Sequence, residues 1–300
     1  MTNVSPNDSR LVSFVIVTHQ RPVFLEACLH SVRAQDYPES EIIVVVNPAD
    51  PHSEAIATQY GARVFRTHAN LGAFPAVNLG IINSNGNRIM IVDDDATFES
   101  NDALSRLNHH LDTHPDCAIA VANIRGPCES APYLQTQPIH VFKNGFALFR
   151  REVFTHSAGY IPDRFFRAGG ETFISNYIYD HDLTVFVVHD VWMFHAQTAM
   201  GRSTRAMNHY SIRNHALLVL LQEPSVCVFP SLGAKVVSSF VRIAVQRRDL
   251  LAWISGWLSF LGNAPWAIGR RKPISIRTYL HLRSLRSGTA GPKVVVTPSS

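Results

Sequence analysis

The hydrophobic positions in the first half of the chain fall into two alternating patterns. Short, mainly apolar segments, typical of buried strands, occupy residues 11–17, 42–46, 63–66, 89–92 and 118–122. Segments with apolar residues at helical spacing separate them, at residues 22–35 and 51–60, from Gly72 onward, and at 103–114. This alternation predicts an α/β protein with a parallel, doubly wound sheet, in which ligands bind at the carboxyl ends of the strands.

The second half of the chain predicts further strands and one long helix. Residues 139–142 and 146–149 have the pattern of two strands joined at Asn144-Gly145, a dipeptide typical of hairpin turns. Strands are also predicted at 185–188 and 191–194, and a helix at 207–221.

Two amphipathic patterns lie near the C-terminus. One apolar stripe at helical spacing comprises Leu250, Trp253, Ile254, Trp257, Leu258 and Leu261, and another comprises Val236, Val237, Phe240, Val241 and Ala244. Basic residues flank both stripes, as in helices that lie on anionic membranes. A helical hairpin packed on the rest of the protein explains the pattern equally well, and the two interpretations are compatible. Nucleic-acid binding is disfavoured, because the basic residues lack interleaved base-stacking aromatics.

The composition is that of an ordinary globular protein: of 300 residues, 46% are hydrophobic and 17% are charged. The net charge of +4 is uneven, since residues 224–300 carry eleven Lys or Arg against Asp249 alone, or +10, which leaves −6 for the rest. The four cysteines are scattered, which argues against a zinc site or a disulfide framework and suits a reducing compartment. With no leader-like N-terminus and no apolar run near the roughly 20 residues of a membrane span, we expect a cytoplasmic protein.

Polar side chains gather where the predicted strands end. Asp93, Asp94 and Asp95 directly follow the strand at 89–92, and three adjacent carboxylates repel one another unless a positive charge lies among them. A divalent cation carrying a diphosphate meets this need, and a solvated acidic turn is the alternative. Residues 18–21 and Asn47 follow two other strands, which favours one common site. Neither a Gly-x-Gly-x-x-Gly nor a P-loop motif is present, so dinucleotide and P-loop folds are not supported.

Four motifs in this order resemble a known family. They are Val-Thr-His-Gln-Arg-Pro at 17–22, Glu-Ile-Ile-Val-Val-Val-Asn at 41–47, Asn-Leu-Gly at 70–72 and again at 78–80, and Val-Asp-Asp-Asp-Ala at 92–96. Their order and spacing are similar to those of the inverting, nucleotide-sugar-dependent glycosyltransferases of the family-2 type, which have the GT-A fold. The closest likeness is to bacterial rhamnosyltransferase-like and galactofuranosyltransferase-like members. The resemblance implies a doubly wound mixed sheet with a helical C-terminal extension.

The resemblance also implies roles for individual residues. Asp93, Asp95 and His195 would hold a divalent metal, Mn or Mg, against the diphosphate of the donor. The nucleotide and donor sugar would contact Thr18, His19, Arg21, Asn47, Asn78 and Asp94.

Glu171 is the expected catalytic base. It matches the first acid of a Gly-Gly-Glu-Asp segment that lies beside the acceptor sugar in the family, and burial among phenylalanines would raise its pKa. From the residues alone, a favourable contact with the dipole of its own helix is the alternative. The chain departs from the family in two places: Thr172 replaces the second acid, and Val46 replaces an aspartate that contacts the nucleobase.

These observations predict a catalytic domain at residues 10–222, a basic helical extension at 223–287, and disordered tails at 1–9 and 288–300. The expected partners are a nucleotide-diphosphate sugar and a glycan or lipid-linked glycan at the inner face of the cytoplasmic membrane, with no nucleic acid. Two alternatives remain: a nucleotidyltransferase, and a catalytically inactive sugar-nucleotide-binding or scaffold protein suggested by Val46 and Thr172.

Overall fold

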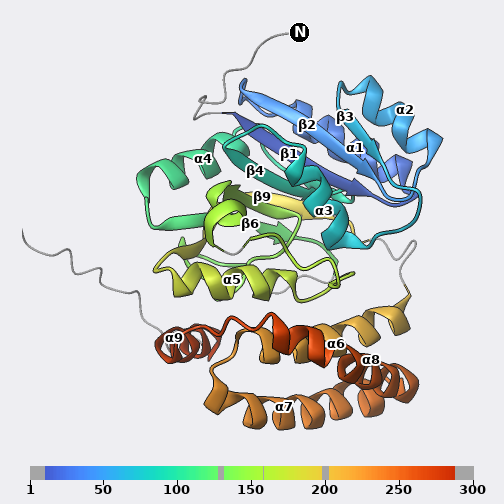
Figure 1. Ribbon diagram of the computed structural model, residues 1–300. Helices are drawn as coiled ribbons and strands as arrows, with labels where there is room; N and C mark the ends of the chain where they lie inside the picture. The colour runs from blue at the N-terminus through green and yellow to red at the C-terminus, as the bar shows by residue number, and fades with distance from the viewer. Residues whose placement is uncertain (1–10, 128–131, 158, 198–202, 288–300) are drawn as a thin grey trace, which may run out of the picture.

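The computed structural model describes residues 11–127, 132–157, 159–197 and 203–287. Within these residues, nine strands form one sheet in the order β3-β2-β1-β4-β8-β6-β9-β5, and β7 pairs with β9 beside this path (Figure 1). The strands are β1 (Val12–Thr18), β2 (Ser40–Val46), β3 (Arg63–Arg66), β4 (Arg88–Asp93), β5 (Ala96–Phe98), β6 (Cys117–Arg125), β7 (Gln137–Pro138), β8 (Phe146–Arg150) and β9 (Thr184–His195). The five strands predicted in the first half correspond to β1, β2, β3, β4 and β6.

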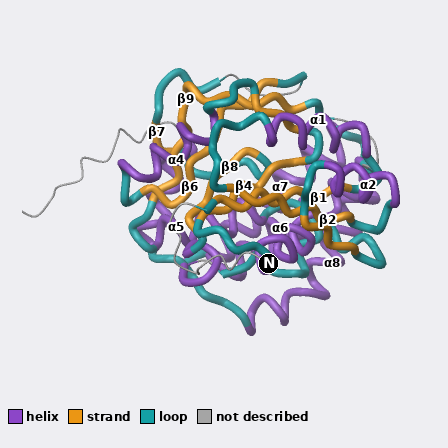
Figure 2. The backbone as a smooth tube through the Cα atoms, turned by 90° about the horizontal axis from the view of Figure 1, so that it is seen from above, coloured by secondary structure: helices purple, strands orange, loops and turns teal. Residues whose placement is uncertain are grey.

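Helices cover both faces of this sheet, which runs through the middle of the molecule (Figure 2). They are α1 (Pro22–Arg33), α2 (Pro51–Gln59), α3 (Ala73–Ile82), α4 (Ala103–Thr113), η1 (Val153–Ser157), α5 (Gly170–Asp180), α6 (Thr204–Gln222), α7 (Ser225–Ser239), η2 (Phe240–Gln246), α8 (Leu250–Gly269) and α9 (Ile276–Ser287). Phe14 and Ile16 of β1 face the core with α1 and α4, whereas Val15 faces the core with α3 and α5. Successive strand residues point to opposite faces, so this continuous apolar run serves two cores.

The sheet is mixed, not wholly parallel. β1 pairs in parallel with β2 and β4, but β8 lies antiparallel between β4 and β6. The predicted hairpin at Asn144-Gly145 is therefore wrong: residues 139–142 form no strand, and β8 finds its partners elsewhere. Ile139 and Phe142 are buried core residues, which explains their strand-like hydrophobicity. The two strands expected at 185–188 and 191–194 are one strand, β9, with a register shift opposite β6.

The C-terminal helices form a layer beneath α5 (Figure 1). Helix α8 packs closely on α6, because a Cβ atom on Gly256 would lie only 2.9 Å from Cβ of Ile212. At the end of α6, the buried side chain of Gln222 donates to the carbonyl oxygen of Phe173 over 2.8 Å, which ties this layer to α5. Residues 223–287 contain α7, η2, α8 and α9. The expected disordered tails lie outside the described residues.

Within the described residues, one helical segment is long and apolar enough to cross a membrane by length and composition. It is Ser225–Gln246, 22 residues in which α7 continues into η2, and an 18-residue window within it has a mean hydropathy of 1.5. This corrects the expectation that no segment reaches such a length. The expectation considered only unbroken apolar runs in the sequence, whereas Lys235 and Arg242 interrupt the apolar run of this helical segment.

Candidate functional site

The ends of four strands bring the predicted site residues to one edge of the sheet. In the parallel register, Thr18 of β1 pairs with Val46 of β2, and Val17 pairs with Asp93 of β4. The antiparallel pairing of β5 with β9 places His195 opposite Ala96, directly after the three aspartates. Residues far apart in the chain therefore meet at this edge.

Arg21 supplies positive charge among the three aspartates. Its Nε atom donates to Oδ2 of Asp94 over 3.1 Å, its Nη1 donates to Oδ2 of Asp95 over 3.0 Å, and its Nη2 contacts Asp94 as well. The hydroxyl of Thr18 donates to Oδ2 of Asp94 over 2.7 Å. Burial raises the pKa of Asp94 to about 6, although Arg21 and Thr18 favour the charged carboxylate. Arg21 thus supplies part of the positive charge that the three adjacent carboxylates need.

The side chain of Asp94, which we expect to contact the donor, is enclosed by residues of the chain itself. Its side chain is 0% exposed, and its oxygens face Arg21 and Thr18. A carboxylate enclosed in this way braces the strand ends and holds Arg21 against Asp95.

Asp93 and His195, together with Asp95, form a group that can hold a metal ion. One ligand atom from each residue lies within 4.8 Å of the others, and Nε2 of His195 is 3.5 Å from Oδ1 of Asp95. The imidazole packs edge-on against Phe146, with ring centroids 4.9 Å apart, which fixes its orientation. Two carboxylates and one imidazole are a donor set suited to Mn²⁺ and acceptable to Mg²⁺. The chemistry of these residues therefore fits a divalent cation.

Gly145 determines where the carboxylate of Asp93 lies. A Cβ atom at this position would be 2.4 Å from Cγ and 2.6 Å from Oδ1 of Asp93, and the φ angle of Gly145 is +87°. Its carbonyl oxygen also accepts a hydrogen bond from the backbone N–H of Asp93 over 3.4 Å. Only glycine combines this backbone conformation with so close an approach. The sequence singles out Gly145 as a turn residue, but gives no sign that it contacts the acidic cluster.

His19 and Asn47 lie together, but they offer different groups. Nδ1 of His19 is 2.8 Å from the backbone oxygen of Asn47, and the His19 side chain remains partly exposed. The Asn47 side chain is buried, accepts from the N–H of Leu71 over 2.8 Å and donates to the oxygen of Gly72 over 3.0 Å. Asn47 therefore fixes the loop that leads into α3 instead of turning its amide outward.

Asn78 connects α3 to the segment that leads to α5. It is buried, and its Nδ2 atom donates to the carbonyl oxygen of Ile161 over 2.7 Å. It is not part of the group formed by Asp93, Asp95 and His195.

Glu171 lies in the first turn of α5, on the face of the sheet that α3 also covers. Gly169 precedes the helix with a φ angle of +91°, and a Cβ atom on Gly170 would lie 2.7 Å from the ring of Phe74. Burial raises the pKa of the Glu171 carboxyl, and backbone hydrogen bonds at Glu171 and Gly169 oppose the rise. A half-buried carboxylate with a raised pKa is suited to accepting a proton.

The loop before Glu171 is held by a pair of residues in α6. The buried side chain of Asn214 donates to the carbonyl oxygens of Arg167 and Ala168 over 2.7 Å and 2.9 Å. Arg213 donates to the carbonyl oxygen of Arg164 and lies over the ring of Tyr210 at 4.7 Å. This pair therefore positions the loop, a function that the spacing of residues along the sequence does not indicate.

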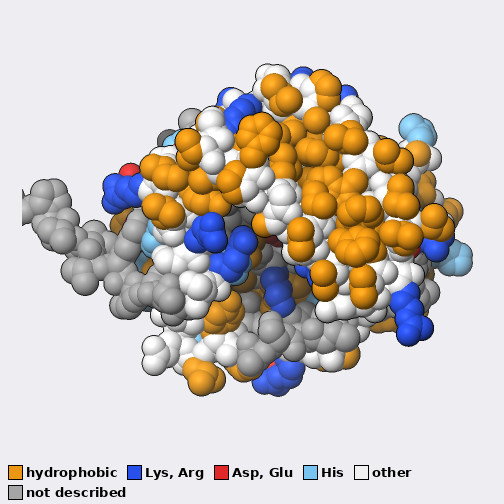
Figure 3. Space-filling model, turned by 90° about the horizontal axis from the view of Figure 1, so that it is seen from below, with side chains coloured by type: hydrophobic (Ala, Val, Ile, Leu, Met, Phe, Trp, Pro, Cys, Tyr) orange, Lys and Arg blue, Asp and Glu red, His pale blue; other side chains and the backbone are white. Residues whose placement is uncertain are grey.

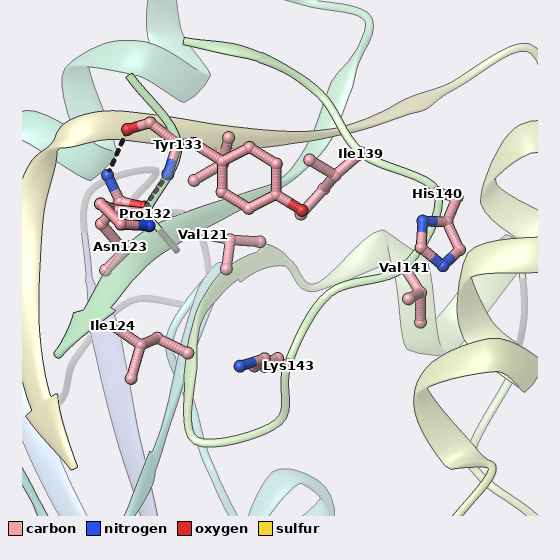
Figure 4. Close-up of a pocket in the computed structure, with 11 residues that line it drawn as sticks. Val121, Asn123, Ile124, Pro132, Tyr133, Ile139, His140, Val141 and Lys143 are labelled. Atoms are coloured by element: carbon pink, nitrogen blue, oxygen red, sulfur yellow. Dashed lines mark hydrogen bonds between the residues drawn. The ribbon is translucent and has the colours of Figure 1, made fainter. Parts of the chain in front are cut away.

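A cavity of about 230 Å³ lies beside the end of β6 (Figure 4). Asn123 braces one wall, because it donates to the backbone oxygen of Tyr133 over 2.8 Å and accepts from its N–H over 3.0 Å. Lys143 and His140 contribute polar groups to the lining. Lys143 is two residues from Gly145, so the cavity adjoins the segment that contacts Asp93.

A doubly wound mixed sheet that gathers two aspartates and a histidine at its strand ends is the arrangement expected of the GT-A fold. The chain belongs to glycosyl transferase family 2, which matches residues 13–168. This match spans β1 to the loop before α5, so it includes the three aspartates and stops short of Glu171 and His195. No curated protein sequence matches the chain.

Solved structures of the same fold cover between 73% and 95% of the chain. TarS of S. aureus (residues 1–349) has a TM-score of 0.61 at 15% identity, covering 93% of this chain and 87% of that one. A mannosyltransferase from Pyrobaculum calidifontis has a TM-score of 0.57 at 15% identity, with coverage of 95% and 84%. GalNAc-T7 has a TM-score of 0.59 at 17% identity, with coverage of 73% and 49%. These likenesses confirm the predicted GT-A fold.

Proposed function

We propose that the protein is a metal-dependent, inverting hexosyltransferase that moves a sugar from a nucleotide-diphosphate donor to a glycan or lipid-linked glycan. The observation that carries the proposal is the group formed by Asp93, Asp95 and His195 in a family 2 glycosyltransferase. The similar mannosyltransferase was solved with GDP-Man and Mn²⁺, TarS with UDP-GlcNAc, and GalNAc-T7 with UDP, GalNAc and Mn²⁺. These ligands support a nucleotide-sugar donor and a divalent cation.

Asp93 and Asp95, in an Asp-x-Asp pattern, would hold the cation together with His195. A bound Mn²⁺ or Mg²⁺ would lower the negative charge that develops on the departing diphosphate. Arg21 and Asp94 keep Asp95 in place through their ion pairs, and Thr18 completes that network. His19 and the loop fixed by Asn47 would line the nucleoside end of the site.

Glu171 would act as the base in a single displacement. The acceptor hydroxyl oxygen bonds to the anomeric carbon as the bond from that carbon to the diphosphate oxygen breaks, and the hydroxyl proton passes to Glu171. The nucleoside diphosphate leaves with the electron pair, so the configuration at the anomeric carbon inverts. The raised pKa of Glu171 supports this role, because a weakly basic carboxylate would accept the proton poorly.

The acceptor we propose is a growing lipid-linked glycan in bacterial cell-surface polysaccharide synthesis, met at the inner face of the cytoplasmic membrane. The basic C-terminal helices and the long apolar segment Ser225–Gln246 support a peripheral association with that membrane. We propose rhamnose or galactofuranose as the donor sugar, and this choice rests only on the resemblance to members of the family that transfer these sugars.

The test is thermal unfolding with UDP, dTDP, GDP, CDP and ATP, each with and without Mn²⁺, for the wild type and Asp95→Asn. We expect one diphosphate to stabilise the wild type only when Mn²⁺ is present, and we expect the variant to lose this effect. A lack of response to every nucleotide would overturn the proposal. Release of pyrophosphate from a nucleoside triphosphate would point instead to a nucleotidyltransferase.

A catalytically inactive sugar-nucleotide-binding protein is the second candidate, because Thr172 stands where the family has another acid. Binding of the donor with Mn²⁺, but without transfer or hydrolysis in the presence of membrane extracts, would favour it. A Thr172→Asp variant that gains transfer activity would show that the wild type is inactive because it lacks the second acid.

A further inference from the structure

The outer face of the C-terminal layer is a continuous apolar surface. Figure 3 shows it from below, where hydrophobic side chains gather over α7, η2 and α8. We define this apolar face by its exposed members, which are Val226, Phe229, Val236, Val237, Phe240, Val241, Val245, Leu250, Leu251, Ile254, Leu258, Leu261 and Ile268. Phe229 is 84% exposed and Leu258 is 63% exposed. Apolar patches of this extent mark sites of interaction with proteins or membranes.

The same helices are held to the protein along their other side. Ser239, at the end of α7, accepts hydrogen bonds from the indole N–H groups of Trp253 (3.0 Å) and Trp257 (3.3 Å) in α8. Ile243 of η2 is buried in a small core with Ile212 of α6. The segment Ser225–Gln246 therefore lies along the layer, beside α8, and cannot cross a bilayer while these contacts persist. A helix bound on one side and apolar on the other suits the plane of a membrane surface.

A basic cluster accompanies this apolar face. The charges of Lys235 in α7 and of Arg283 and Arg286 in α9 all act on Glu223, and Arg242 of η2 acts on Lys235. Four cations from three helical elements thus lie near one another, and three of them share Glu223 as their carboxylate. Arg242, Arg283 and Arg286 have exposed side chains, whereas Lys235 is partly buried. An anion from outside the chain would complete the charge balance here.

We propose that this face docks on an anionic lipid bilayer, with the apolar face immersed at the level of the headgroups and the basic cluster against lipid phosphates. The inference deepens the proposed function, since it rests on the membrane-borne acceptor proposed there. A second copy of the chain is a poorer occupant. In a two-fold dimer this patch would meet itself, and Asp249 is the one acid in residues 224–300, so a second copy offers the four cations almost no carboxylate, whereas anionic lipid neutralises them.

The docked face is linked to the loop that precedes Glu171 and α5. Arg164 donates to the side-chain oxygen of Asn263 in α8 over 2.6 Å and lies over the ring of Trp266 at 5.3 Å. The carbonyl oxygen of Arg164 accepts from Arg213 of α6. Figure 3 shows a hollow with Lys and Arg side chains at its rim beside the apolar face. A lipid-linked acceptor whose tail stays in the bilayer would therefore enter from this side and approach the loop before α5.

The experiment is flotation of the full-length chain with vesicles of phosphatidylethanolamine and phosphatidylglycerol, compared with vesicles of phosphatidylcholine alone. We expect binding to the anionic vesicles that is at least tenfold stronger and that weakens as salt rises. The test variant is Phe229→Ser/Leu251→Ser/Leu258→Ser, in which every altered side chain is exposed. The matched control is Val23→Ser/Ile82→Ser, which changes exposed apolar residues on α1 and α3.

We expect the triple variant to lose at least tenfold in vesicle binding while the control binds as the wild type does. Arg242→Gln/Arg286→Gln should weaken binding to anionic vesicles and leave the weak binding to phosphatidylcholine unchanged. Equal flotation of the triple variant and the wild type would overturn the inference. So would a wild-type dimer in light scattering that the triple variant abolishes, if the wild type does not float.

Thermal shift with nucleotide and Mn²⁺ separates this inference from the proposed function. The triple variant should keep the wild-type melting temperature and nucleotide response, because the altered side chains touch neither the aspartates nor Glu171. If the wild type floats with anionic vesicles but responds to no nucleotide, the docking surface is supported and the proposed function is overturned. If it responds to a nucleotide but does not float, only the docking surface is overturned.

Discussion

Replacement of Gly145 by alanine tests whether the backbone of one turn determines the metal site. The φ angle of Gly145 is +87°, a conformation that costs about 1–2 kcal/mol for a residue with a Cβ atom. The new methyl group would also lie 2.4 Å from Cγ of Asp93, well inside van der Waals contact, so the carboxylate must move. We expect the loss of support for one metal ligand to weaken Mn²⁺ binding about 10–100-fold.

Gly159→Ala is the matched control. The φ angle of Gly159 is +68°, but no atom of the described residues would lie within 4 Å of a Cβ atom there. It should therefore carry a similar backbone strain of about 1–2 kcal/mol without moving any site residue. Comparison of the two variants separates the strain of the turn from the displacement of Asp93.

The assay measures two quantities for each variant. Urea unfolding gives the free energy of unfolding, and the electron paramagnetic resonance signal of free Mn²⁺ gives the affinity for the metal. We expect both variants to lose stability and only Gly145→Ala to lose Mn²⁺ affinity. Wild-type affinity in Gly145→Ala would refute the assignment of Asp93 as a ligand whose position this glycine sets.

Three further predictions concern charges and protons. Arg21→Gln leaves Asp94 and Asp95 without their cation, so we expect a loss of about 3–5 kcal/mol in the free energy of unfolding, measured with urea. Added Mn²⁺ should restore part of this loss. An unchanged free energy of unfolding would contradict the role of the ion pairs. Glu171→Gln should bind nucleotide with Mn²⁺ as the wild type does yet fail to transfer sugar. In the wild type, kcat should fall as the pH drops through the raised pKa of Glu171, because the base becomes protonated; turnover by Glu171→Gln would place the base elsewhere. Burial, with help from His114, lowers the pKa of His110 to about 4, from about 6.5 in the unfolded chain. Protons therefore bind the unfolded chain preferentially as the pH falls below 6.5, and lowering the pH from 7.5 to 5 should reduce stability by about 2 kcal/mol from this group. His110→Phe should show a smaller decrease between the two pH values, and an equal decrease would contradict the assignment.

The alternation of strands and helices in the first half could be predicted from the sequence, and so could the place of Asp93 to Asp95. A buried parallel strand needs a continuous apolar run, and its carboxyl end needs the residues that meet a ligand, so both signals are local. His195 could be proposed only through resemblance to a family. Its place beside Asp95 depends on the pairing of β5 with β9, a contact between segments about 100 residues apart in the chain.

Hydrophobicity identified core positions but not always their structure. Ile139 and Phe142 have the pattern of a strand, yet they are buried in irregular chain because β8 pairs with β4 and β6. The apolar stripe of α8 likewise does not show which side of the helix faces the rest of the protein, because this depends on how α8 packs. In the structure, the small residues Ala252 and Gly256 face α6, and Leu250 and Leu258 face outward. Close helix packing favours small residues at the contact with α6, so several leucines of this helix remain exposed.

By itself, the sequence determined the alternation of strands and helices in the first half of the chain and the acidic run at the end of β4. Only the tertiary structure decided that Arg21 neutralises Asp94, that Gly145 sets Asp93, and that Asn47 and Asn78 hold loops. The physical reason is the separation along the chain of the residues that interact. Strand and helix patterns follow from the solvation of neighbouring residues, whereas these contacts join distant segments whose approach is set by sheet order and by how closely the helices pack.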